Sequence, residues 1–187
     1  MGQEVKTVRP DEERVTRLVH NEARGLLAYF IRRVRQPADA ADLLSQTLLV
    51  IWRRVEKLPT DDAGARMWMY GVANRVLADH RRGEVRRSAL TERLRTELMQ
   101  TPNPDIDATV DVRAALARLH PLDAEIIRLV HWEGFTHVQV ATVLGKRSST
   151  IRSCYHRART QLRSLLYEAG AHRGQDTVST LRVDSPG

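Results

Sequence analysis

The stretch THVQVATVLGKRSSTIRSCYHRARTQL, residues 136–162, predicts two short amphipathic helices that meet at Gly145. Thr136 and Gln139 have the spacing of a capping box, in which both side chains bind free backbone N–H groups at the start of a helix. Gly145 supplies a turn that tolerates positive φ. Apolar residues at helical spacing then give the second helix a buried stripe of Ile151, Tyr155, Ala158, Leu162 and Leu165.

The opposite face of this second helix is polar and basic. It is centred on Ser149, Ser153, His156 and Thr160, with Arg152 and Arg163 on one side and Arg157 on the other. A helix-turn-helix presents such a face to the major groove of DNA, where Arg donates paired hydrogen bonds to guanine. The alternative is the solvated face of a bundle helix, which acidic residues normally balance, but none lies between Lys146 and Leu166.

The composition is typical of a basic, helical protein. The chain has 187 residues, which suits one domain or two small ones, and its formal charge is +7. Leu, Ala, Arg and Glu dominate and aromatic residues make up only 5%, so we predict an all-α fold. The basic surplus fits nucleic-acid binding and simple solubility equally well.

Nothing in the sequence predicts an enzyme. The one cysteine, Cys154, excludes an internal disulfide and a cysteine-based zinc site. The seven histidines are scattered, no HExxH pattern occurs, and there is no glycine-rich phosphate loop. We therefore expect no catalytic residues, no metal site and no cofactor.

The sequence also indicates a cytoplasmic protein. No apolar run approaches the ~18 residues that a membrane span requires. The N-terminus, MGQEVKTVRPDEERV, lacks the apolar core of a signal peptide.

Two helical blocks flank a polar connector. Pro102 and Pro104 break any helix in QTPNPDID, although residues 88–99 remain open to a helix. We expect an N-terminal extension (1–19), a first domain (20–87), a linker (88–110), a second domain (111–167) and a mobile C-terminal tail (168–187).

Apolar spacing predicts three helices in the first domain. The first ends before Pro37, and the third contains Trp68 and Val72 and finishes in the basic cluster HRRGEVRR. The second repeats apolar residues on one face: Leu44, Leu48, Ile51 and Val55.

The stretch at residues 134–162 resembles region 4 of the extracytoplasmic-function (ECF) sigma factors of bacterial RNA polymerase, in the sigma-70 family. Upstream, DAADLLSQTLLVIWRRV (39–55) and ARMWMYGVANRVLADHRRG (65–83) resemble region 2 of the same family. The resemblance covers most of residues 22–167, in the family's order. It implies two small helical domains, a region 2 bundle and a region 4 helix-turn-helix, joined by a flexible linker.

The resemblance also implies partners and site residues. The partners are core RNA polymerase, through its β′ clamp and β flap, promoter DNA and an anti-sigma protein. It assigns core polymerase binding to Asp42, Leu43, Gln46 and Trp52, with core packing as the alternative for Trp52. It assigns −10 DNA binding to Trp68, Asn74, Arg75, Asp79, His80, Arg81 and Arg82, and −35 DNA binding to Ser149, Thr150, Arg152, Ser153, His156 and Arg157.

Melted DNA needs a basic groove and surfaces on which unpaired bases stack. Trp68 and Tyr70 are candidates for such stacking, with core packing as the alternative for Trp68. The resemblance thus predicts a promoter-recognition subunit for transcription initiation. The alternatives are a stand-alone helix-turn-helix repressor or activator, a basic helical adaptor for an acidic protein and, more remotely, a nucleic-acid-modifying enzyme.

Overall fold

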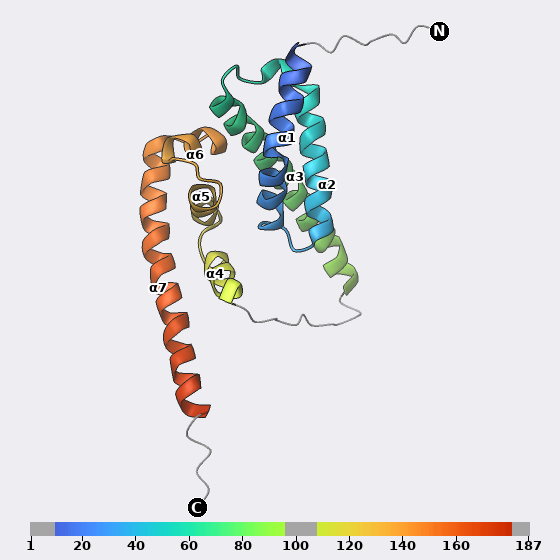
Figure 1. Ribbon diagram of the computed structural model, residues 1–187. Coiled ribbons are helices and arrows are strands. Elements are labelled where there is room, and N and C mark those ends of the chain that lie inside the picture. The colour runs from blue at the N-terminus through green and yellow to red at the C-terminus, as the bar shows by residue number, and fades with distance from the viewer. Residues whose placement is uncertain (1–9, 96–107, 181–187) are drawn as a thin grey trace, which may run out of the picture. The chain divides into compact units, whose positions relative to one another are not determined.

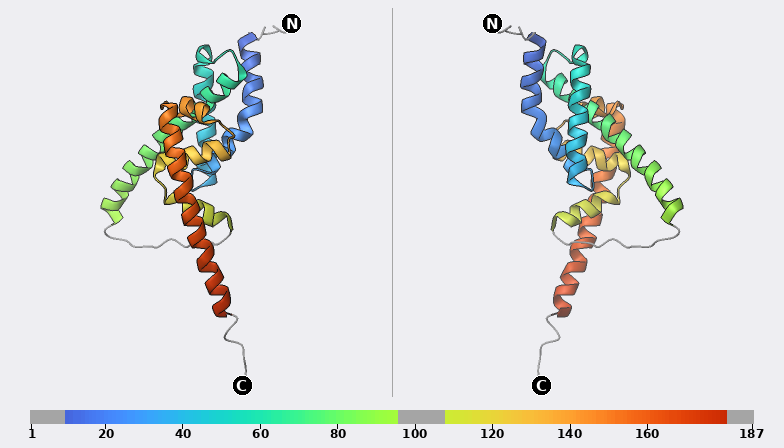
Figure 2. Two further views of the ribbon diagram at one scale, coloured as in Figure 1. Left: turned by 90° about the vertical axis from the view of Figure 1, so that its left-hand side faces the viewer. Right: turned by 90° about the vertical axis from the view of Figure 1, so that its right-hand side faces the viewer.

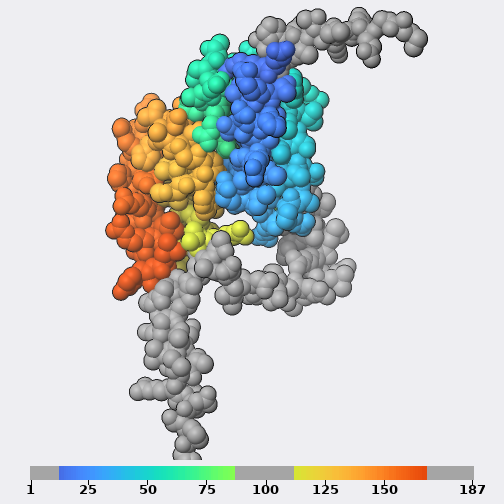
Figure 3. Space-filling model, in the orientation of Figure 1, coloured from blue at the N-terminus to red at the C-terminus, as the bar shows by residue number. Residues whose placement is uncertain are grey.

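The computed structural model describes residues 10–95 and 108–180 (Figure 1), and the side chains of residues 13–86 and 112–167, which are coloured in Figure 3. The described residues form the helices α1 (Pro10–Ile31), α2 (Pro37–Arg53), α3 (Asp62–Arg95), α4 (Ala108–Ala117), α5 (Pro121–His131), α6 (His137–Leu144) and α7 (Ser148–Thr180), and a short 3₁₀ turn, η1 (Val55–Lys57). They divide into two compact units, one built on α1 to α3 and the other on α4, α5 and α7. The predicted all-α fold with two small helical domains is confirmed. None of the described helices is both long and apolar enough to cross a membrane.

In the first unit, α1 and α2 run antiparallel and α3 packs against both (Figures 1 and 2). The Tyr29 ring meets the rings of Phe30 and Tyr70 edge-on, with centroids 5.2 and 5.7 Å apart, an arrangement that stabilises aromatic pairs. Gly25 lets α1 approach α3, because a Cβ there would lie 2.6 Å from the Tyr70 hydroxyl. Tyr70 is 2% exposed, so the prediction that it stacks on DNA bases is wrong.

The core face of α2 is shifted from the predicted one. Its buried residues are Ala40, Leu43, Thr47 and Ile51. Leu44 and Leu48 are only half-buried. The prediction counted apolar residues alone, whereas the Thr47 hydroxyl donates a hydrogen bond of 2.7 Å to the Leu43 carbonyl. That bond satisfies the hydroxyl and lets a polar residue occupy the core.

The long helix α3 begins with a cap from Asp61, whose carboxylate accepts a hydrogen bond of 2.6 Å from the Gly64 N–H. No proline lies between Asp62 and Arg95, so the helix passes the basic cluster without a break. The helix left open over residues 88–99 is thus present as far as Arg95. The two prolines of the connector lie outside the described residues.

The second unit packs α4 and α5 against α7. Its core cluster consists of Ala115, Leu116, Leu119, Ala124, Ile127, Ala158 and Leu165. Three residues of the predicted α7 stripe, Ile151, Ala158 and Leu165, are buried, and Tyr155 and Leu162 are half-buried against the cluster. The predicted stripe is therefore confirmed.

The capping box and the glycine turn that lead into α7 are both present. The Thr136 N–H donates to Gln139 Oε1 at 2.9 Å, and the Gln139 N–H donates to Thr136 Oγ1 at 3.3 Å. Gly134 and Gly145 have φ values of 70° and 61°, in the left-handed region that favours glycine. The helix–turn–helix prediction is confirmed at these positions.

The helix α7 runs on to Thr180, so residues 168–180 of the predicted C-terminal tail are helical. Once a helix has formed, each added residue gains a hydrogen bond. No proline lies between Ser148 and Thr180 to stop that propagation. Apolar periodicity in the sequence is weak beyond Tyr167, so it did not predict this part of the helix.

Candidate nucleic-acid and polymerase interfaces

The first turns of α7 expose the polar face that the sequence predicts. All six predicted −35 residues are exposed. All except Arg157 lack an ion pair among the described side chains: Ser149, Thr150, Arg152, Ser153 and His156. The Ser153 hydroxyl donates to the Ser149 carbonyl at 3.2 Å, a bond it can exchange for a DNA acceptor. The Arg152 guanidinium is therefore available for a phosphate or a base edge.

Arg157 has a different environment. Its Nε and Nη2 each donate to a carboxylate oxygen of Asp123 at 2.9 Å, which makes a bidentate pair between α7 and α5. Asp123 is 1% exposed, so this carboxylate depends on the pair for its neutralisation. The hydrogen bond with Asp123, and then its charge, raise the pKa of Arg157 above its ordinary value. Arg157 thus holds α7 against α5, a role that apolar periodicity does not reveal.

A second polar connection orients α7 through Tyr155. Its hydroxyl lies 3.2 Å from His131 Nε2, on α5, and its ring centroid lies 4.5 Å from that of His137, on α6. The half-buried tyrosine therefore touches the helices on both sides of the Gly134 loop. These contacts fix the direction in which the exposed face of α7 points.

In the first unit, α3 carries a basic stripe along its exposed side. Arg75, Asp79, Arg82 and Arg86 recur at spacings of 4, 3 and 4 and are all exposed. Arg82 pairs with Asp79 one turn earlier, and since both side chains are more than half exposed this pair contributes little stability. A DNA phosphate can therefore replace the Asp79 carboxylate as the partner of Arg82 with little loss of stability. Arg86 was not predicted, although its spacing from Arg82 gave the signal.

Three further predicted −10 residues lie on α3 beside or before this stripe. Arg81 is exposed, and Asn74 and Trp68 are half-buried. Two hollows adjoin the stripe. A shallow one is lined by Arg81, Arg82, Val85 and Arg86, and a cleft of about 170 Å³ between α2 and α3 is lined by Val50, Arg54, Val72, Arg75, Val76 and Asp79.

His80 lies away from the basic stripe. Its side chain is 16% exposed and points toward the first turn of α2 instead of outward. Helical geometry explains this, because one residue beyond Asp79 is about 100° further round α3. The prediction that His80 contacts DNA does not fit this orientation.

The exposed side of α2 carries three of the four predicted polymerase-binding residues. Asp42, Gln46 and Trp52 are exposed, and Trp52 is 42% exposed, which excludes full core packing. Leu43 is 1% exposed and belongs to the core, so its side chain is not part of this surface. Leu49 lies between Gln46 and Trp52 and is 55% exposed, an apolar side chain that the sequence reading missed.

The two units match two known domains. Residues 13–87 match the family described as Sigma-70 region 2, and residues 109–162 match Sigma-70, region 4. The fold and the exposed basic helices therefore define a protein of the sigma-70 class. Solved structures share the fold: the sigma factor RpoE of Bartonella quintana, in complex with the anti-sigma factor NepR, has a TM-score of 0.66 at 21% identity over 83% of this chain and 98% of that one. CnrH, in complex with the cytosolic domain of CnrY, has a TM-score of 0.61 at 21% identity over 84% and 90%.

Similarity to individual proteins is more specific. The ECF RNA polymerase sigma factor SigL of Mycobacterium tuberculosis is 30% identical over 168 residues, which are 87% of this chain and 94% of that protein. The ECF sigma factor SigE of Mycolicibacterium smegmatis is 30% identical over 145 residues, 73% of this chain and 55% of that protein. The chain belongs to the ECF family of RNA polymerase sigma factors, and its function is to direct the polymerase to promoters.

Proposed function

We propose that the exposed face of α7 reads the −35 element, that the basic stripe of α3 binds the −10 element, and that the exposed side of α2 docks on core RNA polymerase. The observation that carries this division is the face of α7. It presents short polar side chains and an unpaired Arg152 on a helix that is fixed from behind by Arg157 and Tyr155. A rigid helix with a free guanidinium suits base readout in a major groove.

The α3 stripe suits single-stranded DNA. Arg75, Arg82 and Arg86 track one side of the helix over about 16 Å, a span that fits successive phosphates. Trp68 lies on the same side, two turns before Arg75, and its half-exposed ring supports stacking on an unpaired base. Compared with the residues predicted from the sequence, the proposed −10 surface excludes His80 and includes Arg86.

The α2 surface suits a protein partner. Asp42 and Gln46 supply polar contacts, and Leu49 and Trp52 supply an apolar centre of the kind that carries binding energy in protein interfaces. An anti-sigma protein that occludes these surfaces is a further proposed partner, supported by the solved complexes of similar fold. The protein would act in the cytoplasm, as a regulatory subunit and not as a catalyst.

Transcription with purified core polymerase of the source organism tests the proposal. Genomic fragments are transcribed with and without the protein, and start sites are mapped. We expect new start sites that share upstream −10 and −35 motifs. Absence of a complex with core polymerase, together with tight operator binding by the protein alone, would favour the stand-alone helix-turn-helix regulator and overturn the proposal.

Matched variants test the α2 surface separately. Leu49→Ala should weaken association with core polymerase. Ile31→Ala is the control, because it removes a similarly exposed aliphatic side chain from another helix of the same unit: Ile31 is 47% exposed and Leu49 is 55% exposed. Ile31→Ala should leave the association unchanged. Equal losses in both variants would indicate general destabilisation and remove α2 from the proposed interface.

A further inference from the structure

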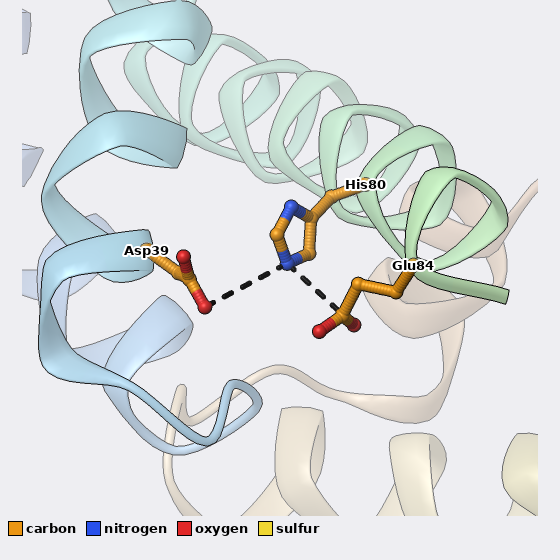
Figure 4. Close-up of side chains that lie close together, drawn as sticks. All are labelled: Asp39, His80 and Glu84. Atoms are coloured by element: carbon orange, nitrogen blue, oxygen red, sulfur yellow. Dashed lines mark ion pairs between the residues drawn. The ribbon is translucent and has the colours of Figure 1, made fainter. Parts of the chain in front are cut away.

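Three potential metal ligands converge between α2 and α3. Figure 4 shows the His80 imidazole facing the carboxylates of Asp39, in the first turn of α2, and of Glu84, one turn further along α3. His80 Nε2 lies 3.6 Å from Glu84 Oε2 and 4.0 Å from Asp39 Oδ2. One ligand atom from each residue lies within 4.8 Å of the other two. Asp39 is 41 positions before His80 in the sequence, so the sequence does not show that it lies beside the His80–Glu84 pair of α3.

The nitrogen at the centre of the arrangement is unsatisfied. Nε2 of His80 is buried and has no hydrogen-bond partner. Buried polar atoms are nearly always bonded, so such an atom requires an explanation. Two carboxylates also face the same nitrogen, and like charges at such a distance repel each other. A cation between the three groups would satisfy the nitrogen and neutralise the carboxylates together.

We propose that Asp39, His80 and Glu84 bind a divalent transition-metal ion of the zinc class. One imidazole nitrogen and two carboxylate oxygens form a ligand set that zinc accepts, and an imidazole is a poor ligand for the harder magnesium and calcium ions. The site supplies three protein ligands and leaves the fourth coordination position open to water, as in zinc sites that are accessible to solvent.

The distances are close to those that coordination requires. With bonds of about 2.0–2.1 Å in tetrahedral geometry, two ligand atoms lie about 3.4 Å apart. The observed separations from Nε2, 3.6 and 4.0 Å, exceed this by a few tenths of an ångström. The Glu84 and Asp39 side chains are 49% and 33% exposed, so both have room to close that gap and the ion has a route from solvent.

The ion would join the start of α2 to the second half of α3. On α3 the ion would bind in the turn that carries Asp79 and Arg81. On α2 it would bind one turn before Asp42. Metal binding to the folded protein stabilises it by mass action. The inference stands on the ligand geometry alone and does not depend on which DNA or protein surface is correctly assigned.

Metal titration of the full-length, untagged, chelator-treated protein tests the site. Zn²⁺ binding is followed by calorimetry, and Co²⁺ binding by its visible absorption, which reports the coordination geometry. We expect binding of a single equivalent. The substitutions Asp39→Asn, Glu84→Gln and His80→Gln should each weaken binding about tenfold or more, while His20→Gln and Glu56→Gln, at exposed positions elsewhere in the same unit, should leave it unchanged.

Thermal unfolding provides a second measurement that does not depend on the His80 variant folding normally. Zn²⁺ should raise the Tm of the wild type and should not raise that of Asp39→Asn, whose partly exposed side chain is not needed for the core. The site would be rejected if the wild type binds neither metal, or if the three ligand variants bind as well as the controls. An ion pair with protonated His80 would then account for the geometry.

Discussion

At the scale of single residues, two arginines of α7 with the same charge have different expected effects. Arg152 lies in the first turns of α7, where a helix entering a groove contacts bases, and Arg163 lies 11 positions, about 16 Å, further along the same side. We predict that Arg152→Ala lowers −35-dependent transcription about tenfold, as loss of a base contact does, and relaxes sequence preference at one position.

The control for this prediction is Arg163→Ala, which removes the same charge from an exposed site. It should weaken binding slightly and equally on all promoter sequences, and reduce the salt dependence of binding. Measurement on a set of single-base promoter variants separates the two behaviours. Equal, sequence-independent losses in both variants would show that Arg152 binds phosphate only.

The pair between Arg157 and Asp123 gives a prediction about stability. Arg157→Gln should lower the Tm, because it leaves the buried Asp123 carboxylate without its cation. Arg159→Gln, at an exposed position on the same helix, should have little effect. The raised pKa of Arg157 keeps its guanidinium charged: this contribution is present below the ordinary pKa of arginine and is lost only above the raised one, so Arg157 adds no pH dependence near neutrality.

A double-mutant cycle decides whether the effect belongs to the pair. When Asp123 is already asparagine, Arg157→Gln should lower the Tm much less than it does in the wild type. The same loss in both backgrounds would mean that Arg157 stabilises α7 through other contacts, and that its guanidinium is not committed to α5.

At the scale of elements, the turn between α6 and α7 depends on backbone conformation alone. Gly145 has a φ of 61°, and a Cβ at this position would meet no atom within 4 Å. Gly145→Ala should therefore destabilise the turn between α6 and α7 by about 1–2 kcal/mol, the cost of a left-handed conformation for a residue with a side chain. Gly145→Asn should cost less, because asparagine visits this region more readily. Denaturant unfolding measures the loss of stability in both variants. Equal losses for Gly145→Ala and Gly145→Asn would indicate steric crowding instead of backbone strain.

The elements differ in how well the sequence predicts them. The capping box, the Gly145 turn and the α7 stripe depend on residues close together in the sequence, and local chemistry was sufficient to predict them. The core face of α2 was misplaced because a buried Thr47 is polar in the sequence and satisfied only in the helix. The helical extension of α7 was missed because apolar periodicity reports packing and not helix propagation.

The residues of the candidate site also differ in how well the sequence predicts them. Family resemblance located the exposed residues of α7 and α2, but it also included Leu43, which helical phase places in the core. The contacts between distant residues, Arg157 with Asp123 and His80 with Asp39, required the fold. Sequence spacing within one helix predicts which residues share a face, whereas it carries no information about which side chain of another helix lies opposite.

At the scale of the whole molecule, the two units each have their own core and each present a basic helix. A chain of this kind is suited to reading two separate DNA elements, because each unit can contribute binding energy through its own contacts. The formal charge of +7 adds a salt-dependent attraction to DNA that both units share. A stand-alone helix-turn-helix regulator, by contrast, would bind DNA through the second unit alone, and substitutions in the first unit would remove no DNA contact.

This difference gives a prediction for a double variant. Arg152→Ala in α7 and Arg75→Ala in α3 lie in different units, so their free-energy effects should add and their fold losses in promoter-specific transcription should multiply. The measurement is transcription by the reconstituted holoenzyme with each single variant and the double variant, alongside association with core polymerase, which should stay unchanged. If Arg75→Ala has no effect, or if the double variant is no worse than Arg152→Ala alone, the α3 stripe does not contact promoter DNA and bipartite reading by these two helices is wrong.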